Sequence, residues 1–217
     1  MYLSKLVLNP RSREARRDLA RPYELHRTLA RAFTTPERQD YRAAHGVLFR
    51  LEAALPGQLP TVLVQSLTAP DWRALPPDYL GCDAQEKPVV LAFTPGQVLG
   101  FRLLANPTRK VAREGRSQGQ RVPLLDKAPD DGPTPARHWL HRKAALSGFE
   151  VLHVLSEDFQ LPLAPSASAK QQVPFYGVRF DGLLRVHDPE LLTLALRQGI
   201  GSAKAFGFGL LSLARSS

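Results

Sequence analysis

The sequence predicts an α+β fold in which one arrangement of elements occurs twice. In each half of the 217-residue chain, strand-like and helix-like segments follow the order strand, helix, strand, strand, helix, strand. The apolar and charged contents, 43% and 23%, are typical of a globular chain that can bury one or two cores. This order is the split βαβ pattern, so we expect two tandem ferredoxin-like βαββαβ domains.

The first half begins with a strand and a basic helix. Residues 2–8 alternate toward apolar and predict a strand. Residues 11–33 are helix-prone, and Pro36 ends this helix because proline lacks the amide proton that a helix needs. The other expected elements are strands at 47–52 and 61–67, one helical turn around Trp72, and a strand at 97–105.

The second half repeats this order. Its expected elements are a strand at 121–125, a helix at 135–147, a strand at 149–155, a hairpin-like pair at 175–187, a helix at 188–197 and a strand at 208–213. Gly148 closes the first helix as a C-cap. Asp181-Gly182 is a strong hairpin dipeptide, and Asp188-Pro189 is typical of a capped helix start. We therefore expect one domain at residues 1–108 and another at 118–217, with the polar segment 106–120 as a linker or mobile loop.

Composition restricts the partner and the compartment. The net charge is +9, and 22 of the 29 cations are arginine. Guanidinium groups pair bidentately with phosphate, which favours nucleic acid, although a GC-rich genome would also enrich arginine. The single cysteine, Cys82, excludes an intrachain disulfide and a cysteine-based zinc site. No apolar run approaches the roughly 20 residues that span a bilayer, and no signal peptide is recognised, so we expect a cytoplasmic protein without a membrane partner.

The basic helix carries the sharpest group of candidate catalytic residues. At 100° per residue, one face forms an apolar stripe of Leu25, Leu29, Ala32 and Phe33. Tyr23 and His26 are three residues apart and share an adjoining face, with Arg27 and Arg31 beyond Tyr23. A phosphate held by these arginines would come within reach of the imidazole.

Histidine at this position suits RNA cleavage without a metal. Imidazole transfers protons near neutral pH, and RNA supplies its own nucleophile, the ribose 2′-hydroxyl. Positioned proton transfer contributes about 10²–10⁴-fold, and a cation such as Arg27 or Lys204 would stabilise the developing charge. The alternative is a half-buried structural histidine with a satisfied hydrogen bond, beside a tyrosine that only packs.

Residues 199–209, GIGSAKAFGFG, form a glycine-rich loop around a single cation. Gly199, Gly201, Gly207 and Gly209 permit backbone angles and close approaches that a Cβ forbids, and successive amides can bind an anion beside Lys204. The loop follows a helix and precedes a strand, which is the reverse of a dinucleotide-binding loop. The alternative is a turn with a solvated lysine.

Other candidates carry less weight. His138 and His141 have a spacing that suits a metal, but no third ligand lies nearby in sequence, so we expect an exposed helix face. No cofactor or metal is expected. Phe206 and Phe208 are candidates for base stacking, and Phe208 suits the core equally well.

The chain resembles the CasE family, the CRISPR repeat-processing endoribonucleases of the Cascade effector complex. The glycine run matches the superfamily pattern G-h-G-x5-G-h-G, with its cation at Lys204. The segment from Tyr23 through His26 and Arg27 to Leu29 is similar to the catalytic helix of the family. Residues 63–72 and 101–107 resemble its N-domain strands, and the likeness covers nearly the whole chain.

The resemblance implies tandem ferredoxin-like domains and metal-independent cleavage of precursor CRISPR RNA at the 3′ base of each repeat hairpin. It implies a 2′,3′-cyclic phosphate product and retention of the mature guide RNA with other Cascade subunits. His26 then transfers the proton and Tyr23 orients or stabilises the phosphate, while Lys204 and the glycine loop contact RNA. Arg109 and Arg116, together with Arg179 and Arg185, are plausible contributors to stem binding.

Two other functions fit the same residues. A cleavage-inactive subunit would only anchor the RNA hairpin in a ribonucleoprotein complex, although a pure binder needs no proton-transfer residue. A basic scaffold without RNA specificity would bind hairpin and scrambled RNA equally, with a salt dependence set by the number of phosphates contacted.

Overall fold

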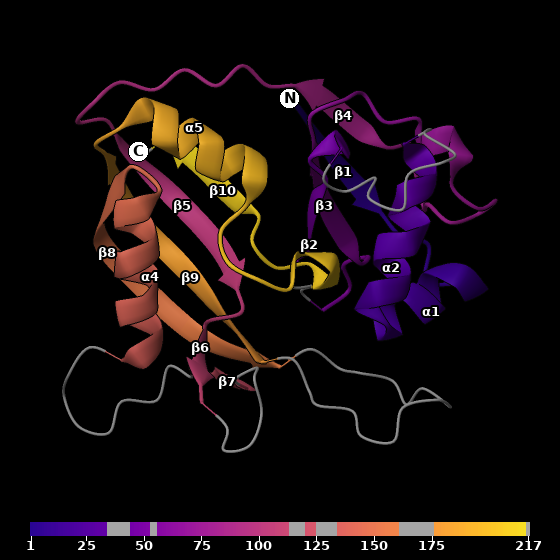
Figure 1. Ribbon diagram of the computed structural model, residues 1–217. Helices are drawn as coiled ribbons and strands as arrows, with labels where there is room; N and C mark the ends of the chain where they lie inside the picture. Colours follow the sequence, from indigo (N-terminus) through magenta and orange to yellow (C-terminus); the bar gives the residue numbers. More distant parts are fainter. Residues whose placement is uncertain (34–43, 53–55, 113–119, 125–133, 161–175, 216–217) are drawn as a thin grey trace.

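The computed structural model describes residues 1–33, 44–52, 56–112, 120–124, 134–160 and 176–215. Two α/β units lie side by side, each with its own four-stranded antiparallel sheet (Figure 1). The first unit holds the N-terminus and the second holds the C-terminal strand. No helix within the described ranges is long and apolar enough to cross a membrane.

The first sheet has the strand order β2-β3-β1-β4. Its strands are β1 (Tyr2–Val7), β2 (Leu48–Leu51), β3 (Thr61–Ser66) and β4 (Gln85–Pro88). The helical elements of this unit include α1 (Arg13–Ala20), α2 (Pro22–Leu29) and the short 3₁₀ helices η1 (Ala30–Ala32) and η2 (Trp72–Ala74). One face of the sheet is apolar because side chains alternate along a strand, and it packs with the helices around Leu6, Leu29, Phe49 and Val64.

The predicted single helix at 11–33 is interrupted at residue 21. Ser12 caps α1, since its hydroxyl accepts a hydrogen bond from the amide of Ala15 at 3.4 Å. Arg21 leaves the helical region, with φ −140° and ψ 88°, and Pro22 occupies the first turn of α2. Proline lacks the amide proton that continues a helix but suits the first position of a new one. The break lets α1 and α2 pack against each other.

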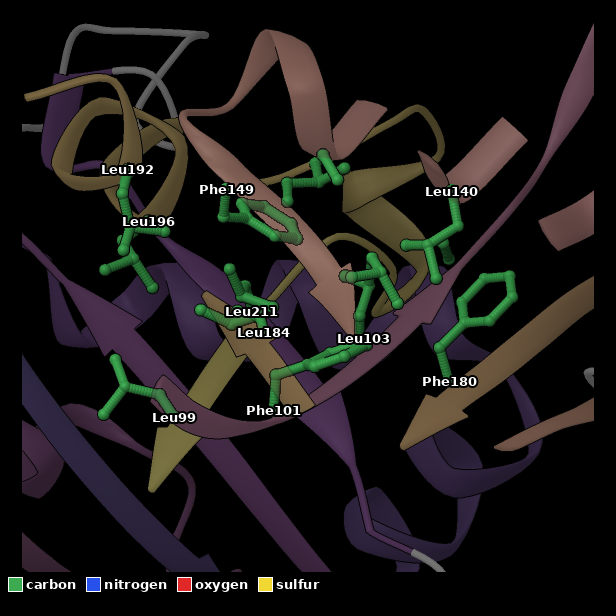
Figure 2. Packing of buried hydrophobic residues seen from close by; sticks show 14 of the residues in the cluster. Leu99, Phe101, Leu103, Leu140, Phe149, Phe180, Leu184, Leu192, Leu196 and Leu211 are labelled. Carbon is green, nitrogen blue, oxygen red and sulfur yellow. The ribbon is translucent and has the colours of Figure 1, made fainter. Parts of the chain in front are cut away.

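The second sheet has the strand order β10-β5-β9-β8. Its strands are β5 (Val98–Ala105), β8 (Phe149–Gln160), β9 (Tyr176–Val186) and β10 (Leu211–Arg215). Helices α4 (Pro135–Leu146) and α5 (Pro189–Gln198) cover one face of it. Figure 2 shows how leucine and phenylalanine side chains from the strands and helices fill this core, among them Phe101, Leu140, Phe149 and Leu192.

Strand pairing divides the chain earlier than expected. The expected boundary at residue 108 places the strand at 97–105 in the first domain, whereas β5 pairs with β9 and β10 in the second sheet. The fourth strand of the first sheet is instead β4, at one edge, whose sequence QEKP is exposed at every position and carries no apolar alternation. Each sheet then has the order fourth, first, third, second strand of its own βαββαβ unit, which is the ferredoxin-like topology. Strands β6 (Thr108–Val111) and β7 (Gln120–Pro123) form a hairpin where a linker was expected.

The predicted hairpin at Asp181-Gly182 is also wrong, because β9 is one continuous strand. Its pairing with β8 shifts register between Val151 and His153, and Gly182, which pairs with Val154, lies next to this bulge. A Cβ on Gly182 would clash with the carbonyl oxygen of His153. The glycine therefore serves a close backbone approach at a bulge rather than a turn.

Polar contacts join the two units. Nη1 of Arg50 on β2 donates to the backbone carbonyls of Arg102 and Leu210 at 3.4 and 3.3 Å. The Gln65 side-chain amide on β3 donates to the Leu196 carbonyl at the end of α5 at 2.6 Å. These contacts fix β2 and β3 against the second unit, and so they fix the surroundings of α2.

Candidate active site

Helix α2 presents Tyr23 and His26 side by side. Their ring centroids are 5.9 Å apart with an interplanar angle of 46°. Tyr23 is 51% exposed and His26 is half-buried, so the pair lies between the core and the surface. The two side chains therefore lie on adjoining faces of the helix, as their three-residue spacing predicts. The predicted apolar stripe, Leu25, Leu29, Ala32 and Phe33, is buried in the first core.

Two further rings extend this pair into a row. Phe206 lies 5.8 Å from Tyr23, and Phe49 is stacked on His26 with a centroid separation of 6.3 Å and an angle of 15°. The row therefore reads Phe206, Tyr23, His26, Phe49. Phe49 comes from β2 and is fully buried, whereas Phe206 comes from the glycine loop of the second unit and is half-buried. We call these four side chains the aromatic row.

The predicted cations near the helix lie at the surface. Arg27 is 66% exposed at its side chain and pairs with Glu24 on the preceding turn at 3.4 Å. Such an exposed pair contributes little to stability, so the guanidinium is able to exchange this partner for a phosphate. Arg31 is exposed on η1, one turn beyond α2.

Arg17 and the buried carboxylate of Asp18 link the end of α1 to α2 and to Tyr79. Asp18 is inaccessible to solvent and accepts hydrogen bonds from Arg17 and, at 2.8 Å, from the hydroxyl of Tyr79. Arg17 also donates to Thr28 of α2 at 3.3 Å, which links the two helices. Burial, followed by the negative charge of Asp18, raises the pKa of Tyr79, so the phenol keeps its proton and its hydrogen bond.

The glycine loop has the positive φ angles that its sequence predicts. All four predicted glycines, Gly199, Gly201, Gly207 and Gly209, have φ between +74° and +92°. The two triplets close on each other, since the amide of Ile200 donates to the carbonyl of Gly209 at 2.9 Å. A Cβ on Gly199 would lie 2.8 Å from a methyl of Leu48, and one on Gly207 would lie 3.2 Å from the ring of Phe49. The loop therefore packs closely against Leu48 and Phe49 of the first unit.

Lys204 opens η3 (Lys204–Phe206), the short helix between the triplets. This helix packs against α2, so the loop brings its cation and Phe206 to the same side of the first unit as the Tyr23–His26 pair. Lys204 is half-buried. Phe208, in contrast, is fully buried against Leu104 and belongs to the core.

The other predicted RNA contacts lie elsewhere. Arg109 is exposed on β6, on the hairpin that follows β5 in the second unit (Figure 1). Arg116 lies outside the described residues. Arg179 pairs with Glu157 and Asp181, and Arg185 pairs with Glu150 at 3.2 Å, so both already face carboxylates. The structure thus places Gly207 against Phe49 of the aromatic row and packs η3, which begins at Lys204, against α2. Gly201 lies instead against Trp139 of the second unit, and Arg109 lies on the β6–β7 hairpin.

Sequence reasoning missed the role of Phe49 in this site. Residues 47–52 were predicted as a strand, but nothing local indicates that this ring meets a histidine 23 positions earlier. No group of three histidine, cysteine, aspartate or glutamate residues within the described part of the chain is placed to hold a metal ion. His138 and His141 are exposed on α4.

Known proteins match this chain over nearly its whole length. A family model described as "CRISPR associated protein" matches residues 1–215. The chain belongs to this family. It is 39% identical to the CRISPR-associated endoribonuclease Cse3 of Thermus thermophilus, over 99% of this chain and 100% of that protein. It is 34% identical to the Cascade subunit CasE of Escherichia coli, over 99% of each chain.

Solved structures agree with the family assignment and the fold. Thermus thermophilus Cse3 bound to an RNA that represents a pre-cleavage complex superimposes with a TM-score of 0.82, at 41% identity and 98% coverage of both chains. Escherichia coli Cas6e superimposes with a TM-score of 0.70, at 27% identity and full coverage of both chains. Both agree with the tandem ferredoxin-like prediction.

Proposed function

We propose that this protein is a CRISPR endoribonuclease that cuts precursor CRISPR RNA at the 3′ base of the repeat hairpin. The observation that carries the proposal is the Tyr23–His26 pair, held at the protein surface beside the glycine loop in a chain whose relatives are named endoribonucleases. A pure binding protein needs no proton-transfer residue at such a position.

Cleavage proceeds by attack of the ribose 2′-oxygen on the adjacent phosphorus. The 2′-hydroxyl loses its proton as the new O–P bond forms, and the bond from phosphorus to the 5′-oxygen breaks as that oxygen gains a proton. The products are a 2′,3′-cyclic phosphate and a 5′-hydroxyl, and no external nucleophile is consumed. The His26 imidazole takes part in one of these proton transfers, worth about 10²–10⁴-fold. Tyr23 orients the phosphate from three positions away on α2.

Charge on the phosphorane is offset by nearby cations. Arg27 is exposed on the same helix, and Lys204 lies on the loop that packs against it. A guanidinium suits phosphate because its N–H groups form a planar fork, whereas the lysine ammonium acts as a point charge. The glycine loop further allows an RNA backbone to approach its main chain, and Arg109 and Arg116 bind phosphates of the stem.

The mature guide RNA stays bound, and other Cascade subunits assemble around it. The relative from Escherichia coli is named a Cascade subunit, and another structural relative belongs to an RNA-guided surveillance complex. The cytoplasm is the compartment in which precursor CRISPR RNA would be met.

The deciding experiment mixes the protein with a CRISPR repeat hairpin in EDTA and analyses the cut ends. The wild type is expected to leave a 2′,3′-cyclic phosphate, while His26→Ala binds the hairpin with unchanged affinity and cuts about 10²–10⁴-fold more slowly. His153→Ala, which removes an exposed histidine of β8, is the matched control and cleaves normally. Wild-type protein that binds the hairpin without cutting would support the cleavage-inactive subunit instead. Equal affinity for a scrambled RNA would support a basic scaffold.

A further inference from the structure

The two phenylalanines at the ends of the aromatic row fix the catalytic pair between them. Phe49 stacks on His26, and Phe206 meets Tyr23 on its other side. We propose that Phe49 and Phe206 are positioning residues that set the orientation of His26 and Tyr23 for cleavage. This inference rests on the proposed function of the pair.

Phe49 is a rigid support for the imidazole. Its side chain is 1% exposed, and its strand pairs with β3 through the register Phe49 to Val64. The next residue, Arg50, anchors β2 to carbonyls of the second unit. A near-parallel ring at 6.3 Å restricts rotation of the imidazole, and a centroid separation of this size is within the range of favourable aromatic pairs.

Phe206 is supported by the backbone of the glycine loop. Short helix η3 is flanked by Ala203 and Gly207, both with positive φ, at 59° and 86°. The amide of Phe206 donates to the Ala203 carbonyl at 2.9 Å, which closes the turn. The loop therefore holds the ring in place against Tyr23.

The glycine loop also links the two ends of the aromatic row, because it contacts Phe49 next to Phe206. Gly207 follows Phe206 in sequence, and its Cα lies so near the ring of Phe49 that an added Cβ would come within 3.2 Å of it. The loop from the second unit thus touches Phe49 with one residue and Tyr23 with its neighbour. A displacement of the loop would change the orientation of both catalytic side chains together.

Positioning makes a specific prediction about which kinetic quantity changes. Misplacing a reacting group by about 1 Å costs up to ~10²-fold in rate without weakening substrate binding. If the rings instead stacked on RNA bases, their loss would weaken binding of the hairpin, because base stacking on aromatic side chains contributes to affinity. The ratio of rate loss to affinity loss separates the two roles.

The experiment measures single-turnover cleavage with protein in excess, and separately the Kd of a hairpin that carries a 2′-deoxy nucleotide at the cut. Phe49→Leu and Phe206→Leu are each expected to slow cleavage by ~10–100-fold with unchanged Kd. Phe206→Tyr keeps the ring at a half-exposed position and is expected to restore the rate. Phe149→Leu is the matched control, since this equally buried phenylalanine packs in the second core against Phe101 and should cleave normally.

A second arm tests whether Phe49 acts through His26. In a His26→Ala background, Phe49→Leu is expected to leave the residual rate unchanged, because groups that act as one unit are non-additive. Normal cleavage by both leucine variants, or an affinity loss as large as the rate loss, would overturn the positioning role. Cleavage by His26→Ala at a rate close to that of the wild type would instead overturn the proposed function, so the two failures are distinguishable. If Phe49→Leu does not fold, the cleavage rate and Kd of Phe206→Leu still test the positioning role.

Discussion

Replacing Arg50 by methionine is expected to weaken the junction between the two units. Arg50 is 5% exposed at its side chain, and its Nε and Nη2 atoms donate to Oε1 of Glu52 at 2.9 and 2.6 Å. Its Nη1 atom reaches carbonyls of β5 and of the residue before β10. Burial lowers the pKa of Arg50, and the charge of Glu52 acts in the opposite direction, so the guanidinium depends on this carboxylate.

The size of the effect follows from what methionine leaves behind. Removing one partner of a fully buried ion pair costs about 3–5 kcal/mol. Glu52 is 26% exposed and retains Arg102 at 3.5 Å, which reduces the penalty. The two carbonyl contacts, at 3.4 and 3.3 Å, are the part of this network that crosses to the second unit, and their loss weakens the junction while adding less to the total than the ion pair does. We therefore expect Arg50→Met to lower the free energy of unfolding by about 2–3 kcal/mol, a large part of the 5–15 kcal/mol typical of a folded protein.

The chain contains its own reporters for each unit. Its two tryptophans are Trp72, beside the first core, and Trp139, buried in the second. Trp72→Phe and Trp139→Phe versions of the protein let urea unfolding of each unit be followed by fluorescence. The two transitions of the parent are expected to coincide. In Arg50→Met they should separate, with a midpoint shift of about 1 M urea for an m-value near 2–3 kcal/mol/M.

Arg50→Lys and Arg73→Met are the comparison variants. Arg50→Lys should recover only part of the lost free energy of unfolding. A single ammonium group cannot reach Glu52 and both carbonyls at once, as the forked guanidinium does. Arg73 forms an exposed pair with Asp71, and its replacement should not change stability measurably. Coincident transitions in Arg50→Met, at the parent midpoint, would show that the Arg50 contacts do not couple the units.

Three other substitutions test separate parts of the structure. Gly207→Ala places a Cβ at φ +86° and against Phe49, so we expect a loss of about 1–3 kcal/mol in urea unfolding and slower cleavage of the hairpin. Gly182→Ala forces the strands apart beside the β8 bulge and should destabilise by a similar amount; unchanged stability in urea unfolding would contradict the close approach of the His153 carbonyl to Gly182. Tyr79 has a folded-state pKa raised above its ordinary value near 10, so above pH 10 the unfolded chain releases the proton first. Stability should then fall by up to ~1.4 kcal/mol per pH unit, and Tyr79→Phe should flatten this slope in unfolding curves at about pH 9–11.

The pairing of Tyr23 with His26 was predictable because its geometry is local. Residues three apart on a helix share adjoining faces whatever surrounds them, so Tyr23 and His26 could be paired from spacing alone. The glycine pattern likewise indicated positive φ, which all four positions have. Phe49 could not be found in this way, because its contact with His26 depends on how β2 packs against α2.

The errors in the fold have the same origin. Strand β5 was predicted within a residue of its start, but its partners β9 and β10 lie far along the chain, and only pairing reveals to which sheet it belongs. Strand β4 is polar and exposed, so no periodicity indicates it. Asp181-Gly182 carries a genuine turn preference, which the long pairing with β8 and β5 overrides.

The composition predicts the kind of partner, whereas the contacts of each arginine determine which of them can bind a phosphate. A net charge of +9 indicates a polyanionic partner, but it does not say which arginines meet phosphate. Arg50, Arg102, Arg179 and Arg185 all lie within 3.5 Å of a carboxylate, so an RNA phosphate must displace or share an existing partner at each. Phosphates that merely replace a carboxylate gain less than those bound by a hydrated cation. The slope of affinity against salt therefore counts the phosphate contacts actually made, at about 0.7–0.9 per contact, and it should be well below the slope implied by all 22 arginines.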